Sequence, residues 1–162
     1  MNTRKRTKVP LLSRLGTASA LTAAAVGTSL LTPWAPEAVA AEAVAAAPGM
    51  DALRVAASKK GAPYKWGASG PHRFDCSGLT QYAFKQAGKK LPRTAAGQYN
   101  KAQKVPTTTR TRGDLVFFRS GQSVYHVGIY AGHGRIWHAP KTGAVVRLER
   151  IWSRNVSYGR VG

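Results

Sequence analysis

The order in which hydrophobic patterns follow one another along this chain limits the folds that are open to it. Helical patterns fill residues 51–103, whereas short apolar stretches joined by glycine-containing connections follow from Gly113 onward. Short connections between successive strands favour antiparallel pairing. Helices first and strands afterwards predict an α+β fold, in which N-terminal helices pack on a C-terminal antiparallel β-sheet.

Cap and turn residues divide these patterns into individual elements. Asp51 is predicted to cap a first helix, Cys76 to begin a second helix that stops at Gly88, and Thr94 to cap a third. The predicted strands are residues 114–119, 125–131, 135–139 and 145–149. The C-terminal residues 151–162 can add an edge strand.

Residues 1–40 have the order of a secretory signal peptide. A basic segment precedes an apolar stretch, and Ala38-Val39-Ala40 offers a cleavage site before Ala41. The alternative is an uncleaved membrane anchor, but the apolar stretch of about 17 residues is at the short end of what spans a bilayer. We therefore expect an exported protein without stable membrane association after cleavage. Residues 41–49 are then a spacer, and residues 50–162 form one small domain that is by default a monomer.

The chain is strongly basic, with 25 Lys and Arg against 6 Asp and Glu and a formal net charge of +19. Residues 1–40 hold five of the basic and one of the acidic side chains, so the remainder carries about +15. Such a charge indicates an anionic partner: nucleic acid, acidic lipid or the phosphate-bearing polymers of a bacterial wall. The basic residues are scattered, and no aromatic RNA-binding signature, zinc-finger spacing or repeat accompanies them, so no nucleic-acid partner is expected.

Cys76 is the only cysteine of the chain, which is unusual for an exported protein. It lies where a loop becomes a helix, and the free N–H groups and the positive end of the helix dipole favour an anion there. We therefore expect a lowered thiol pKa and an accessible nucleophile. The alternative is a buried, inert thiol, which is how most free cysteines behave.

Two of the four histidines fall on neighbouring predicted strands. If the turn between these strands has three residues, 131–133, then His126 lies directly opposite His138 on one face of the sheet. A two-residue turn at Gly132-His133 would instead place Val127 opposite His138 and separate the two imidazoles onto opposite faces. In the first register His126 can accept the thiol proton and His138 can orient the ring of His126. Nucleophile, base and orienter are the roles that a thiol protease needs.

The other two histidines are predicted to have no catalytic role. His72 lies beside Pro71 in the loop before the second helix, and His133 lies at the tip of the predicted turn. Loop residues of this kind are expected to be solvated.

A metal site is the competing interpretation of this set, because zinc accepts one thiolate and two imidazoles, here Cys76, His126 and His138. The strand region offers no carboxylate to complete it, since the only one beyond Asp114 is that of Glu149. No metal and no cofactor is therefore expected.

Six short stretches together resemble the NlpC-type family of bacterial cell-wall cysteine peptidases. They are YKWG (64–67), FDCSGL (74–79), LPRTA (91–95), GDLVFF (113–118), HVGIYAG (126–132) and WHAP (137–140). They follow the order of the family and span essentially the whole of residues 50–162. The resemblance implies a papain-like fold and a hydrolase of the thiol protease class.

The resemblance also implies a catalytic role for four residues. Cys76 would be the nucleophile, His126 the base and His138 the polar third member. The Tyr64 hydroxyl, with the backbone N–H of Cys76, would stabilise the oxyanion of the tetrahedral intermediate.

Two further residues and the substrate are implied in the same way. Asp75 and Ser77 resemble residues that in this family bind the free amine or the D-residue of the substrate, although Asp75 can equally cap the second helix. The substrate would be the stem peptide of peptidoglycan, typically cut between γ-D-glutamate and a diamino acid. The protein would act at the bacterial cell wall or outside the cell, where anionic wall polymers would retain a basic chain.

Two alternative functions remain open at this point. A peptidoglycan amidase or an acyltransferase of the same fold would share the Cys–His pair. A catalytically silent, basic wall-binding protein would keep the fold and use only its charge, although the intact set of Cys76, His126 and His138 argues against it.

Overall fold

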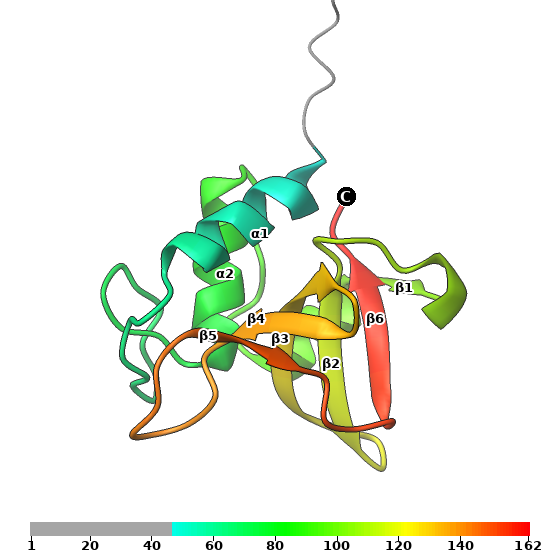
Figure 1. The fold of residues 1–162 in the computed structure, drawn as a ribbon. Coiled ribbons are helices and arrows are strands. Elements are labelled where there is room, and N and C mark those ends of the chain that lie inside the picture. Colours follow the sequence, from blue (N-terminus) through cyan, green and yellow to red (C-terminus); the bar gives the residue numbers. More distant parts are fainter. Residues whose placement is uncertain (1–46) are drawn as a thin grey trace, which may run out of the picture. The chain divides into compact units, whose positions relative to one another are not determined.

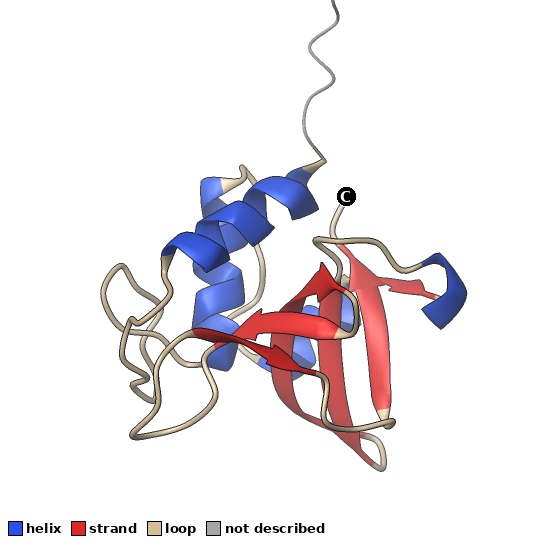
Figure 2. Ribbon diagram, viewed as in Figure 1, coloured by secondary structure: helices blue, strands red, loops and turns tan. Residues whose placement is uncertain are grey.

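The computed structural model describes residues 47–162. The predicted signal peptide 1–40 and most of the predicted spacer 41–49 therefore lie outside the described residues. Within them, three α-helices are followed by a six-stranded antiparallel sheet (Figures 1 and 2). The α+β prediction is confirmed. No helix in residues 47–162 is long and apolar enough to cross a membrane.

The helices begin close to where the cap residues predicted. Helix α1 is Pro48–Ser58, α2 is Cys76–Gln86 and α3 is Ala95–Lys101. Helix α2 begins at the predicted residue, and Gly88 follows its end with a left-handed φ of 77°. The side chain of Thr94 caps α3, as predicted. Helix α1 differs, because it begins before Asp51, which lies in the first turn and pairs with Arg54.

The sheet has the strand order β1-β6-β2-β3-β4-β5. Its strands are β1 (Gln103–Val105), β2 (Leu115–Ser120), β3 (Ser123–Gly132), β4 (Arg135–His138), β5 (Arg147–Arg150) and β6 (Val156–Arg160), and a 3₁₀ turn, η1 (Thr107–Thr109), follows β1. The prediction that the C-terminal segment adds an edge strand is wrong, because β6 lies between β1 and β2 and pairs with both. The short strand β1, which has no clear alternating pattern, takes the edge instead.

The hairpin between β3 and β4 differs from both turns considered from the sequence. His133 and Gly134 form a two-residue turn with positive φ at both positions, and Ala131 is an extra, bulged residue between the pairs Tyr130–Ile136 and Gly132–Arg135. A two-residue turn alone would place the side chains of His126 and His138 on opposite faces of the sheet. The extra residue in the bulge returns them to the same face. The prediction that the two histidines are directly opposed is therefore wrong, but the prediction that they share a face holds.

Alternation along the strands gives the sheet two apolar faces. Leu115, Phe117, Val127 and Ile129 pack with buried residues of α1 and α2 in one cluster. Side chains on the opposite face of β2 and β3, with one each from β4 and β6, form a second cluster, which consists of Val116, Phe118, Tyr130, Ile136 and Tyr158. The parity of β3 and β4 places both histidine side chains on the face of this second cluster.

Candidate active site

Cys76 is the first residue of α2, and the helix is packed against β3. Strand β4 ends at His138, and its last pair with β3 is Ile129–Trp137, so β4 does not cover the stretch of β3 around Val127. The half-buried Cys76 thiol lies in this place, close enough to the backbone N–H of Val127 for that group to influence its pKa. The thiol therefore adjoins the residue that directly follows His126 in the chain.

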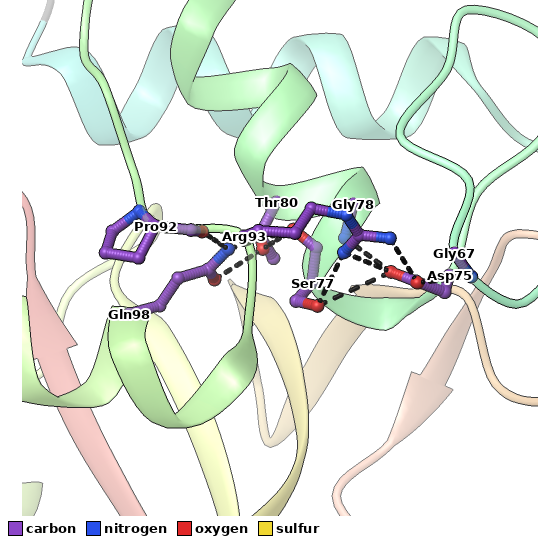
Figure 3. A network of polar contacts seen from close by, with 8 residues as sticks. All are labelled: Gly67, Asp75, Ser77, Gly78, Thr80, Pro92, Arg93 and Gln98. Atoms are coloured by element: carbon purple, nitrogen blue, oxygen red, sulfur yellow. Dashed lines mark hydrogen bonds and ion pairs between the residues drawn. The ribbon is translucent and has the colours of Figure 1, made fainter.

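Asp75 holds the start of α2 in position through five hydrogen bonds that its carboxylate accepts, one of them from the Ser77 hydroxyl at 3.4 Å. Its carboxylate accepts from the N–H of Gly78 at 2.7 Å, which is the helix cap, and from the N–H of Gly67 at 2.9 Å. The guanidinium of Arg93 donates to both carboxylate oxygens (Figure 3). Burial alone would raise the pKa of Asp75, but these donors outweigh it and lower the pKa below its ordinary value. The cap role of Asp75 is confirmed.

A buried amide connects α3 to the first turn of α2. Gln98 donates from Nε2 to the carbonyl oxygens of Ser77 and Pro92, both at 2.9 Å, and its Oε1 accepts from the Thr80 hydroxyl at 2.6 Å (Figure 3). The Ser77 hydroxyl accepts from Arg93 at 3.1 Å. No buried polar side-chain atom of Asp75, Ser77, Thr80 or Gln98 lacks a partner, which restricts movement of the helix start.

On the other side of the site, the two histidines and a glutamate form a hydrogen-bonded row. Nε2 of His126 lies 2.8 Å from Nδ1 of His138, and Nε2 of His138 lies 3.0 Å from Oε2 of Glu149. The same carboxylate oxygen accepts from Nε of Arg147 at 2.8 Å. Strands β3, β4 and β5 each contribute to the row.

The carboxylate at the end of the row assigns the tautomers of both rings. Glu149 only accepts, so Nε2 of neutral His138 carries its proton and Nδ1 of His138 must accept. Nε2 of His126 therefore donates to it, and Nδ1 of His126 is left with a lone pair. That nitrogen is free to accept a proton.

Gly128 makes room for the histidine pair. Continuing the observed register places it across from His138, and a Cβ added to Gly128 would lie 3.2 Å from the Cβ of His138 and 3.0 Å from the carbonyl oxygen of Trp137. The two histidines are consequently diagonal neighbours across the strands, and their rings meet over the missing side chain.

An indole covers the pair. The ring of Trp152 stacks on Phe118 at 4.0 Å between centroids, and it lies 5.5 Å from the ring of His126 and 5.3 Å from that of His138. His126 and His138 are 6% and 1% exposed. Burial, together with the repulsion that a protonated His138 would exert, lowers the pKa of His126 to about 3. Burial also lowers the pKa of His138, although Glu149 opposes this, so both rings are neutral near pH 7.

The electrostatics of the thiol differ from the prediction. Burial raises the pKa of Cys76, and the charge of Asp75 raises it further, while the N–H groups of Ser77 and Val127 and the Ser77 hydroxyl offset only part of this. The predicted lowering of the thiol pKa by the helix start is therefore wrong for the free protein. The thiol of Cys76 and the imidazole of His126 are therefore both neutral at rest.

Tyr64 reaches the site through backbone pairing with the segment before α2. It forms an isolated bridge with Phe74, and its N–H donates to the carbonyl of Ala144 at 2.9 Å. Burial raises the pKa of its hydroxyl, and the nearby Cys76 and Asp75 raise it further. The hydroxyl therefore keeps its proton and can donate a hydrogen bond beside the thiol.

Two cavities meet at Tyr125, which lines both and is 53% exposed. The thiol-side cavity, of about 380 Å³, is lined by Cys76, Asp75, Ser77, Arg93 and Trp66 among others. The histidine-side cavity, of about 420 Å³, is lined by His126, His138, Lys141, Arg147, Glu149 and Trp152 among others.

Sequence reasoning missed several residues that the structure brings to the site. Arg93 stands in the LPRTA stretch, and its signal was a lone basic residue in a motif. Glu149 was noted only as the one carboxylate beyond Asp114, and that scarcity of carboxylates in the strands could have drawn attention to it as a partner of a histidine. Nothing in the sequence singled out Trp152.

His72 and His133 lie on the surface, as predicted. No group of three or more His, Cys, Asp or Glu in residues 47–162 is arranged to hold a metal ion.

Comparison with known proteins finds one family and several relatives. The sequence pattern of the NlpC/P60 family matches residues 61–158. A probable endopeptidase of Corynebacterium glutamicum (strain R) is 48% identical over 105 residues, which are 65% of this chain and 49% of the relative. The bifunctional muramidase/DL-endopeptidase CwlT of Bacillus subtilis (strain 168) is 44% identical over 116 residues, which are 67% of this chain and 35% of CwlT.

A solved structure extends the comparison to the fold. The NlpC/p60 domain of the peptidoglycan hydrolase SagA superimposes with a TM-score of 0.64 at 30% identity, over 70% of this chain and 98% of that domain. The chain spans about half of the Corynebacterium relative and about a third of CwlT.

Proposed function

The chain belongs to the NlpC/P60 family, and from this premise we propose that it is a cysteine endopeptidase that hydrolyses peptidoglycan stem peptides through an acyl-enzyme on Cys76. The observation that carries the proposal is the row from His126 through His138 to Glu149, which leaves Nδ1 of His126 with a free lone pair on the residue next to Val127, whose N–H lies near the thiol. The fold alone would not distinguish a hydrolase from a binding protein.

The first step is proton transfer coupled to attack. Nδ1 of His126 takes the proton of the Cys76 thiol while the sulfur forms a bond to the carbonyl carbon of the substrate. The imidazolium that forms is stabilised by His138, whose other nitrogen faces the Glu149 carboxylate. A base that is neutral at rest is needed here, and burial keeps His126 neutral.

The oxyanion of the tetrahedral intermediate needs donors on the opposite side. The N–H of Cys76, at the free end of α2, and the protonated Tyr64 hydroxyl are the two donors that we assign to it. The intermediate then collapses as the C–N bond breaks, and His126 gives its proton to the leaving amine. A water molecule attacks the thioester, His126 accepts a proton from that water, and the Cys76 thiol is restored.

Substrate recognition is proposed on the thiol side. Ser77 and Asp75 line the cavity that contains the thiol, which is where the acyl part of the substrate would lie. Asp75 is 6% exposed and its carboxylate accepts five hydrogen bonds, so we assign it first to placing Ser77, Cys76 and Arg93. For the bond, we extend to this chain the DL-endopeptidase type that CwlT carries in its name and propose the γ-D-glutamyl-diamino acid linkage.

We also propose that the protein works outside the cell, at the wall. The predicted signal peptide and the formal net charge of +19 support this location, because anionic wall polymers would concentrate a basic protein on its substrate.

Digestion of purified peptidoglycan, followed by mass spectrometry of the new termini, tests the function. New amines on the diamino acid, absent with Cys76→Ala, are expected. Lactoyl carboxylates and L-alanine amines alone would show an amidase, and newly joined peptides an acyltransferase. No product from the wild-type protein would favour the silent, wall-binding alternative.

A further inference from the structure

The histidine-side cavity has a defined place relative to the proposed scissile bond. The thiol attacks the carbonyl carbon, so the acyl part of the substrate lies with Cys76 in the thiol-side cavity. The leaving amine must receive its proton from His126, which lines the other cavity. Tyr125 stands between the two cavities. The leaving peptide therefore extends into the histidine-side cavity.

The histidine-side cavity has more positive than negative side chains in its lining. Its one carboxylate, on Glu149, is already engaged by His138 and Arg147. Lys141 also lines the cavity, and its ammonium has no hydrogen bond or ion pair among the residues that the structure describes. An exposed cation beside a neutralised carboxylate favours an anionic ligand.

Part of the lining of the same cavity is apolar and aromatic. Trp152 is half exposed and Pro140 lies next to Lys141, so an aliphatic stem can lie along the indole while its charged end reaches the ammonium. A diamino acid has both features, an aliphatic chain and a carboxylate. A ligand with the chain but without the charge would fill the same space and leave Lys141 unsatisfied.

We propose that Lys141 is a specificity residue that binds a carboxylate of the leaving peptide, so that the enzyme prefers a leaving residue with a free carboxylate over the same residue with a carboxamide. The inference rests on the proposed function, since it assigns the leaving side of that reaction. Carboxylate and carboxamide have nearly the same shape, so the preference is one of charge.

Two synthetic peptides with the same acyl part, one ending in the diamino acid carboxylate and the other in its carboxamide, provide the test. Wild-type enzyme is expected to have a kcat/KM about 10-fold higher for the carboxylate, the effect of one charge-assisted hydrogen bond. Lys141→Gln should remove this preference by slowing the carboxylate peptide alone, and Lys141→Glu should reverse it. Lys85→Gln, at the other end of α2 from Cys76, removes the same charge and should leave the ratio unchanged.

A preference that survives Lys141→Gln, or a wild-type preference for the carboxamide, would overturn the inference. Binding of the two released diamino acid products to Cys76→Ala protein, measured by calorimetry, gives a readout that does not need turnover. If neither peptide is cut but the carboxylate product binds more tightly through Lys141, the proposed bond fails and the cavity assignment stands. If the carboxylate and carboxamide products bind equally tightly, the inference is wrong, even if both peptides are cut.

Discussion

The two sides of the candidate site are held by different kinds of structure. On the thiol side, Cys76 is placed by hydrogen bonds from residues 67–98, which lie close together in the chain. On the histidine side, His126, His138 and Glu149 come from three strands, and only the register of those strands brings them together. The nucleophile is therefore placed by contacts that are local in the chain, whereas the base depends on the pairing of three strands.

The two sides also differ in charge. The thiol side keeps a charged pair, Asp75 with Arg93, at the edge of a cavity. The histidine side buries two neutral rings under Trp152 and places its charged pair, Arg147 with Glu149, at the outer end. The stability of the thiol side thus depends on the ion pair of Asp75 with Arg93. The stability of the histidine side depends on keeping His126 and His138 unprotonated.

Loss of either reacting group has the largest expected effect and tests whether the two sides act as one unit. Cys76→Ala and His126→Ala are each expected to lower kcat by about 10⁴-fold or more, and the double variant to lose little beyond either. Release of new amine termini from purified peptidoglycan measures this. Multiplicative losses in the double variant would show that the two sides work independently.

Adding one methyl group should damage the histidine side. In Gly128→Ala the new Cβ would crowd His138 and the carbonyl of Trp137, so the pair should lose its alignment and kcat should fall by about 100-fold, as for a misplacement of about 1 Å. The rate at which iodoacetamide modifies Cys76 is expected to fall as well, because His126 is the base that accepts the thiol proton. An unchanged rate would mean that Gly128 does not position His126 for the thiol.

As the pH falls, the histidine side should lose its contribution to stability at a higher pH than the thiol side does. Below pH 6.5 the unfolded chain protonates His126, whereas the folded chain keeps it neutral down to about pH 3, so stability falls as the pH falls through this window. Between pH 7 and pH 5 the free energy of unfolding should drop by about 2 kcal/mol from this residue. Asp75 has its pKa lowered from 3.8, so its contribution is present above that value and is lost only at lower pH. Urea unfolding at both pH values measures this, and His126→Gln should flatten the dependence.

Glu149 offers a finer test of the tautomer argument. Glu149→Leu removes the acceptor that holds the proton on Nε2 of His138, and kcat/KM should fall by about 10-fold, the size of one hydrogen bond to a charged group. Glu149→Gln can still accept from the same nitrogen and should lose less. Equal losses in both variants would point to the negative charge, not the tautomer, as what matters.

The smallest expected effect is on the ion pair of the thiol side. In Arg93→Gln the carboxylate of Asp75 keeps its two backbone donors, and the Arg93 side chain is 37% exposed, so the loss of stability should be about 1–2 kcal/mol. Arg54→Gln removes a guanidinium from an exposed pair with Asp51 and serves as the control, with a change within about 0.5 kcal/mol. Urea unfolding at pH 7 compares the two. A control loss as large as that of Arg93→Gln would remove the distinction between the two pairs.

The sequence allowed the thiol side to be predicted more fully than the histidine side, for a physical reason. A cap and a helix start are read from consecutive residues, so Asp75 and Cys76 were assigned to the correct turn of the correct helix. Strand pairing depends on the turn that joins the strands, so His126 and His138 were assigned to the right face but two residues out of register. Glu149 could not be assigned, because its position follows from two successive pairings.

Electrostatics were the other limit. The pKa of Cys76 depends on how much of the thiol is buried, and that burial is produced by β3, which lies about 50 residues further along the chain. The predicted helix start placed the Cys76 thiol correctly, but it led us to expect a lowered thiol pKa where the pKa is raised. Burial of His126 under Trp152 is hidden from the sequence in the same way.

The bulge at Ala131 constrains how genes for this domain can change length. Removing or inserting one codon anywhere between Tyr130 and Ile136 would turn the side chain of His138 to the other face of the sheet, whereas a change of two codons would preserve it. This surface loop, a kind of segment in which length usually varies freely, is therefore expected to vary among functional descendants in even steps.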